Sequence, residues 1–379
     1  MNRIEDAGGG GLGGGAGPKR QGEPALRRAV LRLAGRVVAT RQGEFALHLF
    51  RDLAAGRVAM VLARGQVSAP GPLLVRVHSS CLTSECLMGC DCDCAEQLER
   101  ALAEIDRAGR GLVVYLMQEG RGAGLSAKAR DRMLVQASGN RMTTFDAYAA
   151  MGLPADLRRY DVVASVLAML GVVGPLRLMT NNPEKRASVA AALAGEKIEV
   201  ERSVALVGRG SPFNRDYLRA KRRSGHAIGA GDRAPGVRPP ERVDAFEPVA
   251  LAADPRRLVT ASYLLPIALA EEVVWFRATV LVDETSGRES IVLASDAWTG
   301  PESTRLPAAP DWLELSLLDR LPLPAPHGRA ALARALRAIA TGGGRVGVLW
   351  NDTLGSSASP SAARARGARP PSVPPMDAR

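Results

Sequence analysis

Apolar and polar positions along the middle of the chain follow two kinds of pattern. Gly111–Met117 is continuously apolar, as in a strand buried on both faces, and Leu73–His78 is a second short apolar strand. Apolar residues recur at helical spacing within Cys94–Ala108. Three further elements are expected downstream: a helix over Arg159–Leu170, a strand over Leu176–Thr180, and a helix over Asn182–Ala194 that is entered through Asn-Asn-Pro. These elements predict an α/β domain with a mixed sheet and flanking helices.

A second block of the chain gives weaker patterns, which predict a smaller α+β domain. It contains no cluster of metal-ligating side chains, and its function is not readable from its residues. No internal repeat at a fixed period is found in the chain. The expected elements are strands at Val273–Val282, Ser290–Ala294, Trp312–Leu318 and Arg345–Trp350, and an alanine-rich helix over His327–Ile339.

Composition divides the chain into five segments. Residues 1–24 are dominated by glycine and are expected to be a disordered tail. The catalytic domain is assigned to residues 25–230, and a linker rich in Gly, Pro and Arg to 231–241. The α+β domain then covers residues 242–351, and a second tail of Ser, Pro, Ala and Arg covers 352–379.

Charge and composition narrow the class of partner. The chain of 379 residues carries a net charge of +11, which indicates either a basic surface with arginine-rich ends or an anionic small ligand such as a nucleotide. Aromatic residues make up only 4% of the chain, so few platforms exist for stacking single-stranded nucleic acid. The sequence shows neither an apolar leader nor a long apolar run, so a cytoplasmic protein without membrane or nucleic-acid partners is expected.

All five cysteines fall in one short window, which is typical of metal binding or redox chemistry in a cytosolic chain. Cys81, Cys92 and Cys94 offer three thiolates, and three protein ligands leave one position of a tetrahedral zinc open for water, as in catalytic sites. Cys86 or Cys90 could instead close the shell of a structural zinc. A structural or redox cluster, a catalytic metal and unliganded buried cysteines all stay open at this point.

Three further sites come next along the chain, and each has an ordinary explanation. Glu119 follows the buried strand, where α/β sheets place ligands, although an exposed turn explains it equally well. Asp156 and Arg158 fit either a site or helix capping. The segment from Thr180 to Lys185 fits either a phosphate-binding helix N-terminus or a simple cap.

Taken together, these motifs resemble GTP cyclohydrolase II over about Val75 to His226. The resemblance rests on the order of many short segments. They are Arg76-Val77-His78-Ser79 with Cys81-Leu82-Thr83, Cys92-Asp93-Cys94 with Gln97, Gln118-Glu119-Gly120-Arg121 with Lys128, Thr144, Gly152, Asp156 with Arg158, Thr180-Asn181-Asn182-Pro183 with Lys185, Val207-Gly208-Arg209, and Tyr217 with Lys221.

The resemblance implies a role for each of these residues. Cys81, Cys92 and Cys94 would hold a zinc ion whose bound water attacks C8 of GTP. Arg158 would act on the α-phosphate, as a nucleophile with Asp156 as its base or as a stabilising charge, and Mg²⁺ would accompany the nucleotide. A homodimer is also implied. Gln97 and Glu119 would read the base, and the remaining substrate-binding positions would be Arg76, Val77, His78, Ser79, Ser80, Gly120, Arg121, Thr144, Thr180 and Lys185.

Four positions depart from the family pattern. Ser80 and Asp91 replace a usual Glu and Arg, and Met117 replaces a usual Arg. The family's catalytic tyrosine is missing, and its position is filled by Arg132 or Met133. Neither residue supplies a phenolic proton donor, so loss of formate is the step expected to fail. The two functional hypotheses are therefore a hydrolase of this type and a catalytically altered zinc- and nucleotide-binding protein with a regulatory C-terminal domain.

Overall fold

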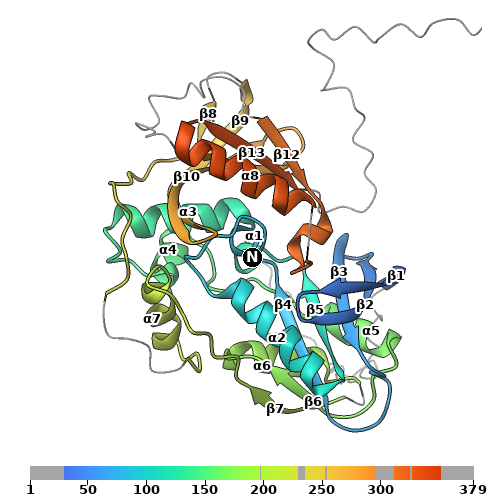
Figure 1. The fold of residues 1–379 in the computed structure, drawn as a ribbon. Helices are drawn as coiled ribbons and strands as arrows, with labels where there is room; N and C mark the ends of the chain where they lie inside the picture. Colours follow the sequence, from blue (N-terminus) through green and yellow to red (C-terminus); the bar gives the residue numbers. More distant parts are fainter. Residues whose placement is uncertain are drawn as a thin grey trace, which may run out of the picture.

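The computed structural model describes residues 30–196, 198–228, 235–251, 254–295, 311–324 and 327–350. Two β-sheets organise this part of the chain, and the later one stands above the earlier one in Figure 1. The expected tails at 1–24 and 352–379 lie outside the described residues, and the expected linker is described only from residue 235 onward. The domain boundaries stay predictions.

The first sheet is mixed, as the sequence predicted. Its strands lie in the order β1-β2-β3-β5-β4-β6-β7. The pairs from β1 to β5 are antiparallel, and the pairs from β5 to β7 are parallel. The strands are β1 (Val30–Thr40), β2 (Gly43–Asp52), β3 (Arg57–Arg64), β4 (Leu73–Ser79), β5 (Gly111–Leu116), β6 (Leu176–Met179) and β7 (Val200–Val204).

Helices cover both faces of this sheet, which explains why β5 is buried along its whole length. On one face Val75 and Val114 share a core with Val163 and Val189 of two helices, and on the other face Val113 packs with α2. The helices of this region are α1 (Leu82–Glu85), α2 (Cys94–Ala108), η1 (Gly120–Gly122), α3 (Leu125–Ala137), α4 (Thr144–Ala150), α5 (Asp161–Met169), α6 (Pro183–Ala192) and α7 (Arg215–Arg223).

The second sheet has six strands in the order β12-β13-β11-β10-β9-β8. Only the β12–β13 pair is parallel. The elements are β8 (Val249–Leu251), β9 (Asp254–Leu269), β10 (Glu272–Asp283), β11 (Glu289–Ala294), β12 (Asp311–Leu315), η3 (Leu317–Arg320), α8 (His327–Gly342) and β13 (Arg345–Trp350). The α+β character expected for this block is confirmed.

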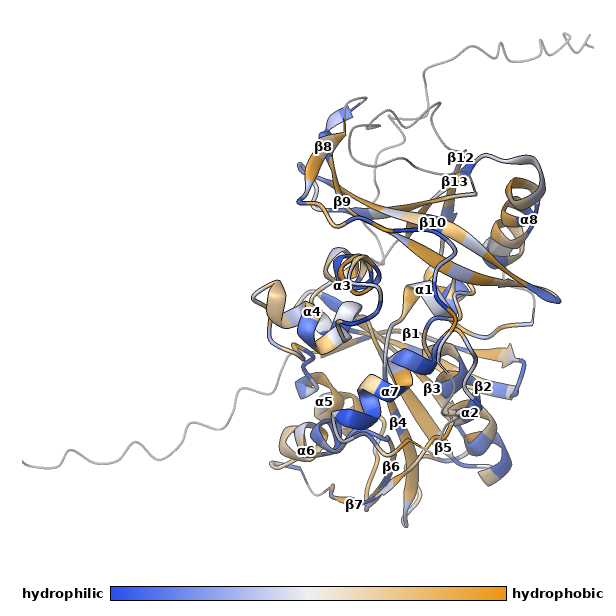
Figure 2. Cartoon of the chain, turned by 90° about the vertical axis from the view of Figure 1, so that its left-hand side faces the viewer, coloured by the Kyte–Doolittle hydropathy of each residue, from blue (hydrophilic) through white to orange (hydrophobic). Residues whose placement is uncertain are grey.

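Helix α3 lies between the second sheet and the rest of the molecule (Figure 2). Its apolar face, formed by Leu125, Ala129 and Met133, belongs to the core of the second sheet. Its other face presents Lys128 and Arg132 to a cavity above the first sheet. One helix therefore connects the second sheet with the side chains of that cavity.

Several elements escaped the sequence pattern. The three antiparallel strands over residues 30–64 were not predicted, and the first of them, β1, is exposed along most of its length and carries no clear alternation. Strand β9 and helix α3 were also missed. The elements that were predicted agree with the structure within a few residues, and the bounds of α2 are those expected.

Candidate metal centre and active site

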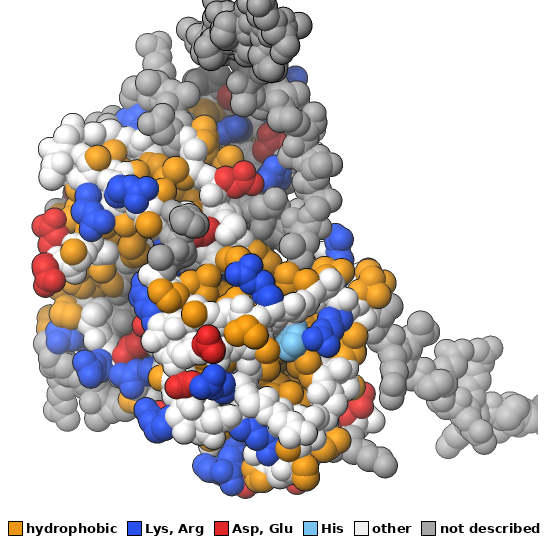
Figure 3. Space-filling view, turned by 45° about the vertical axis from the view of Figure 1, so that its right-hand side comes forward, with side chains coloured by type: hydrophobic (Ala, Val, Ile, Leu, Met, Phe, Trp, Pro, Cys, Tyr) orange, Lys and Arg blue, Asp and Glu red, His pale blue; other side chains and the backbone are white. Residues whose placement is uncertain are grey.

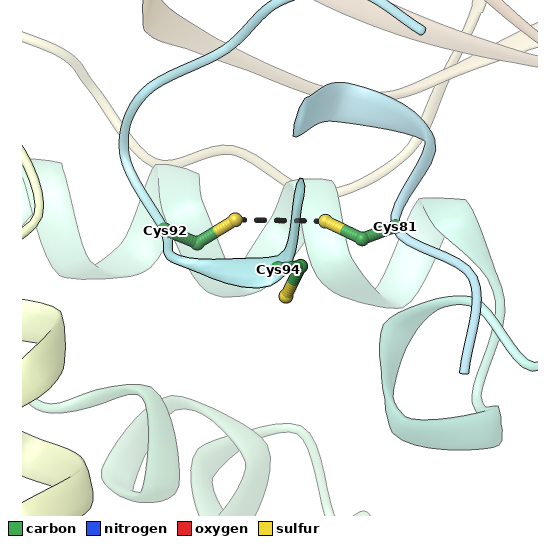
Figure 4. A group of neighbouring side chains, drawn as sticks. All are labelled: Cys81, Cys92 and Cys94. Atoms are coloured by element: carbon green, nitrogen blue, oxygen red, sulfur yellow. Dashed lines mark hydrogen bonds between the residues drawn. The ribbon is translucent and has the colours of Figure 1, made fainter. Parts of the chain in front are cut away.

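Three cysteines from two segments meet at one point. Cys81 lies two residues after β4, at the N-cap of α1, whereas Cys92 lies just before α2 and Cys94 is its first residue. Their sulfur atoms all lie within 4.8 Å of one another, and the sulfurs of Cys81 and Cys92 are 3.5 Å apart. Figure 4 shows Cys81 and Cys92 pointing toward each other, with Cys94 beside them. Among the described residues, this is the one group of His, Cys, Asp and Glu side chains with metal-binding geometry.

The other two cysteines turn away from this cluster. The Cys86 sulfur faces the carbonyl oxygen of Asp319, at 3.6 Å, and the Cys90 sulfur faces that of Pro266, at 3.3 Å. Burial raises the pKa of both thiols, that of Cys90 to about 12, with Asp91 adding to the effect at Cys90. Neither thiol joins the cluster, so Cys81, Cys92 and Cys94 alone are the candidate ligands among the five cysteines.

Lys128 stands beside the cysteine cluster, with its Nζ 3.0 Å from the Cys81 sulfur and 3.0 Å from Glu119 Oε1. Burial opposes the charge on Lys128, but Cys81 and Glu119 outweigh burial and raise the pKa of the ammonium. Hydrogen bonding to Cys92 and Cys94 lowers the pKa of Cys81 well below that of an ordinary thiol, and Lys128 lowers it further. The surroundings therefore favour a thiolate at Cys81.

A cavity with an empty volume of about 1050 Å³, counting the open solvent at its mouth, adjoins the cluster. The structure brings most of the predicted site residues to its wall. The exceptions are Val77, whose side chain is buried in the core, and Cys92, which lies behind Cys81 and Cys94. The predicted residues on the wall are Arg76, His78, Ser79, Ser80, Cys81, Cys94, Gln97, Glu119, Gly120, Arg121, Thr144, Asp156, Arg158, Thr180 and Lys185.

Glu119 is already fully engaged by the protein. Its Oε2 accepts from the Leu82 amide at 2.5 Å, and its Oε1 accepts from the Gly120 amide at 3.1 Å as well as from Lys128. These bonds join the turn after β5 to α1 and α3. A base that contacts Glu119 must share its oxygens with these donors.

The predicted phosphate-binding groups on the floor of the cavity are buried cations. Arg76 donates to the carbonyl oxygen of Met179 at 2.9 Å and to Gln97 Oε1 at 2.7 Å, and burial lowers the pKa of Arg76 to about 10. Lys185 donates to the Val77 carbonyl at 3.2 Å. Burial, with the charges of Arg158 and Arg76, lowers the pKa of Lys185 well below its usual range. An anion placed here would raise the pKa of Lys185 again and favour its charged form.

Asp156 and Arg158 form a closely bonded pair in the loop before α5. Arg158 Nε donates to both carboxylate oxygens, at 2.8 and 3.0 Å, and Arg158 NH2 also donates to Oδ2. Helix α5 begins only at Asp161, so helix capping does not explain the pair. Burial lowers the pKa of Arg158, but Asp156 reverses that effect and raises it above its usual range. The pair therefore favours a charged guanidinium over a deprotonated nucleophile.

The segment before α6 is a satisfied helix cap. Asn182 Oδ1 accepts from the amides of Glu184 and Lys185, at 2.9 and 3.3 Å, and Thr180 Oγ1 accepts from the Asn182 amide. The amides of the first turn are thus occupied by the protein itself. Any phosphate contact here comes from side chains, above all from Lys185.

Two of the departures from the family pattern form a pair. Asp91 Oδ2 lies 2.9 Å from Arg132 Nε, both side chains are largely buried, and the Arg132 guanidinium lies over the ring of Tyr217. Met133 is fully buried in the core of the second sheet. Arg132, and not Met133, therefore stands at the cavity, with its charge balanced by Asp91.

Several residues that line the cavity were not predicted as site residues, including Asp131, Tyr148 and His226. Asp131 accepts from Thr144 Oγ1 at 2.8 Å, and Tyr148 donates to the Gly120 carbonyl at 2.7 Å. A helical spacing of Lys128, Asp131 and Arg132 was the available signal. It was missed because α3 has no strong apolar stripe of its own.

Comparison with known proteins places this geometry in a family. A family model described as GTP cyclohydrolase II matches residues 32–205. A GTP cyclohydrolase-2 from Acinetobacter baumannii (strain AYE) is 42% identical over 184 residues, which are 48% of this chain and 88% of that protein. The chain belongs to the GTP cyclohydrolase II family.

Two longer proteins match this chain over about half of its length. "Riboflavin biosynthesis protein RibBA" from Cytophaga hutchinsonii is 38% identical over 190 residues, 50% of this chain and 45% of that protein, so the chain spans less than half of it. The crystal structure of RibBX, a two-domain 3,4-dihydroxy-2-butanone 4-phosphate synthase from A. baumannii, covers 48% of this chain and 42% of its own at 20% identity. Its TM-score of 0.27 is too low to inform the fold.

The surface adds little to the family match. Figure 3 shows Lys and Arg side chains scattered over one face among apolar and polar atoms, not joined into a stripe. In the part of the chain that the structure describes, each helix is too short or too polar to cross a bilayer. The features that point to a ligand therefore lie in the cavity.

Proposed function

We propose that this chain is a zinc-dependent hydrolase that opens the imidazole ring of GTP and releases pyrophosphate. One observation carries the proposal. Three thiols gather within 4.8 Å of one another beside a cavity lined by buried cations, and the two remaining cysteines face elsewhere. This combination supports a metal with one free position next to a polyphosphate site.

The donor set fits zinc. Three thiolates are soft ligands, and Lys128 beside Cys81 offsets part of their negative charge. Cys81, Cys92 and Cys94 would hold the zinc, which would supply a Lewis acid able to activate water for attack on C8 of the purine. Mg²⁺ on the triphosphate stays a prediction.

Recognition of guanine is assigned to Gln97 and Glu119. Gln97 is fixed by two bonds, from Arg76 to its Oε1 and from its Nε2 to Asp93 Oδ2 at 2.6 Å. Glu119 is fixed by its bonds to Leu82, Gly120 and Lys128. Side chains held in this way offer a rigid edge to a base, and rigidity favours discrimination between purines.

Arg158 is assigned to the phosphates as a permanent charge. Asp156 orients the guanidinium by bidentate hydrogen bonds and raises its pKa, so stabilisation of the departing pyrophosphate is favoured over covalent attack by Arg158. Arg76 and Lys185 add two further cations on the same wall, with Arg121, Thr144 and Thr180 around them.

The product is proposed to keep its formyl group. Asp91 raises the pKa of Arg132 above its usual range despite burial, so Arg132 does not donate a proton as a phenol would. The product would then be the formylated precursor of 2,5-diamino-6-ribosylaminopyrimidinone 5′-phosphate. Formate released in an amount equal to the GTP consumed would contradict this part and make the deformylated pyrimidine the product.

The alternative is a zinc- and nucleotide-binding protein without turnover, with the second sheet as a regulatory surface. Arg132, which takes the place of the family's catalytic tyrosine at the cavity, is the observation behind this alternative. The homodimer, the cytoplasmic location and a place in riboflavin synthesis stay predictions.

Incubation of the zinc-loaded protein with a panel of purine nucleotides tests the proposal, with products identified by mass and formate measured in parallel. Zinc-dependent consumption of GTP with release of pyrophosphate is the expected result. Tight binding of GTP without any consumption would select the alternative.

A further inference from the structure

The two sheets share one topology. The order β1-β2-β3-β5-β4 is repeated as β9-β10-β11-β13-β12, with three antiparallel pairs followed by one parallel pair in each. In each sheet a short helix, α1 or η3, follows the first strand of the parallel pair, β4 or β12, and a long helix, α2 or α8, leads into its second strand, β5 or β13. The sequence shows no repeat at a fixed period, so this repetition is visible only in the fold.

Finer features of the two halves also agree. The first hairpin of each is joined by a two-residue turn, Arg41-Gln42 in one and Ala270-Glu271 in the other. The first strand of each hairpin contains a one-residue bulge, at Leu33 and at Thr260. Strand order, pairing direction, turn length and bulge thus all repeat.

Contacts between the halves are reciprocal. The Arg41 amide in the first hairpin donates to the Pro322 carbonyl, at 3.0 Å, in the segment after η3. Conversely, β9 of the second hairpin pairs with the segment after α1, through Cys90 N to Pro266 O at 2.9 Å and Ala268 N to Met88 O at 3.0 Å. The two short helices meet each other where Cys86 faces Asp319. Such mutual contacts are the mark of an isologous pair of subunits.

Apolar side chains are exchanged in the same reciprocal way. Leu82 and Leu87, from α1 and the segment after it, are buried in the core formed by the second sheet and α8. Leu321, which follows η3, is buried in the core formed by the first sheet and α2. Each half therefore completes the core of the other.

From these observations we infer that residues 254–350 are an internal second copy of the fold of residues 30–116, which serves as a built-in partner subunit for the metal site. The copy has no counterpart of the three cysteines, because the chain has no cysteine after Cys94. Its described residues 321–324 follow η3 as residues 86–93, which include Cys90 and Cys92, follow α1.

The copy supports the site through α3. Glu289 on β11 accepts from the amides of Leu125 and Ser126, at 3.0 and 2.7 Å, and so holds the start of that helix. Near its end, Gln136 exchanges two bonds with the backbone of Leu264, at 2.7 and 2.8 Å. The helix fixed at these two points carries Lys128 to the Cys81 sulfur. Glu289 is thus a positioning residue for the metal centre, although it does not touch it.

A nicked chain tests the built-in partner. A specific protease sequence replaces residues 229–234 in the full chain, and the particle mass is measured by light scattering before and after cleavage in native buffer. The two fragments are expected to remain together, with the same particle mass as before cleavage, and to retain zinc. Separation of the fragments without denaturant would overturn the inference, and this readout needs no catalytic activity.

The variant Glu289→Gln tests the support of α3, with Glu284→Gln on the exposed β10–β11 turn as its control. Loss of the charged acceptor is expected to speed hydrogen exchange at Leu125 and Ser126 by about tenfold and to speed zinc transfer to a chromogenic chelator. The control is expected to match the parent in both rates. Unchanged exchange and unchanged zinc transfer in Glu289→Gln would remove the positioning role.

Discussion

The segment between α1 and α2 and the described residues 321–324 after η3 follow matching elements in two sheets of one topology, yet only the first brings cysteine sulfurs together. Cys92 and Cys94 end the first segment beside Cys81, whereas the second has the sequence Leu-Pro-Leu-Pro. The backbone arrangement alone therefore does not make a site. The side chains of one short loop, and the helix α3 laid against it, make the difference.

Removal of one ligand is the strongest way to break this comparison. Cys92→Ser is expected to lower GTP turnover by at least about 10³-fold and to abolish stoichiometric zinc binding, because two thiolates do not hold a catalytic zinc. Cys90→Ser is the control, since that sulfur faces Pro266. Loss of zinc in Cys90→Ser as well would indicate a closed structural site and refute the open position.

The phosphate end of the cavity is expected to show the next largest effect. Arg158→Lys should lower kcat by about 10²-fold, because lysine cannot reproduce the bidentate bonds to Asp156 or the same charge placement. Steady-state kinetics with GTP measures the effect. Arg159→Lys, whose side chain pairs with Asp161 at the surface, is the matched control. Equal behaviour of the two variants would remove Arg158 from the site.

Substitution of the Asp91–Arg132 pair is expected to change the product of the reaction. The double variant Asp91→Arg with Arg132→Tyr restores the two family residues together, so that the Asp91 carboxylate is not left buried without Arg132. Formate per GTP consumed is expected to rise by about tenfold or more. Met133→Leu, a volume-conserving change in the core, should leave the product as it is. An unaltered product in the double variant would show that the missing phenol is not the cause.

The smallest expected effect is the uptake of a proton by Lys185 when a polyphosphate binds. Since the pKa of Lys185 lies well below its usual value in the free protein, binding of a polyphosphate should raise it and draw up to one proton from solution. The uptake grows as the pH rises through the free-protein pKa, because more Lys185 is then neutral before binding. Titration calorimetry in buffers of different ionisation enthalpy measures it, and Lys185→Met should abolish it. Equal uptake in both proteins would assign the proton elsewhere.

Much of the first sheet could be read from the sequence because its parallel core is built from continuous apolar runs. Gly111–Met117 and the α2 stripe of Leu98, Leu102 and Ile105 are such signals. The order of polar motifs then located most of the cavity wall. By contrast, Lys128 and Arg132 lie on a helix whose apolar face is defined only by the second sheet, so their position depends on contacts far apart in sequence.

Three features could not be predicted from the sequence: strand β1, the repeated topology and the contacts of Glu119. Strand β1 is largely exposed, and its periodicity is correspondingly weak. The repeated topology left no periodic pattern in the sequence because corresponding segments carry different side chains, with cysteines in one and prolines in the other. The hydrogen bonds to both Glu119 oxygens likewise come from Leu82, Gly120 and Lys128, which lie in different segments of the chain. A local sequence pattern does not predict such contacts.

The exchange of leucines between the halves also bears on how the molecule matures. Leu321, which fills the core beside α2, is synthesised more than two hundred residues after the first strand of that core, while Leu87 must wait for β9 to β13. A nascent chain released before its last strand would thus leave both interiors open. Unfolding should accordingly take place as a single cooperative transition, with neither sheet melting alone.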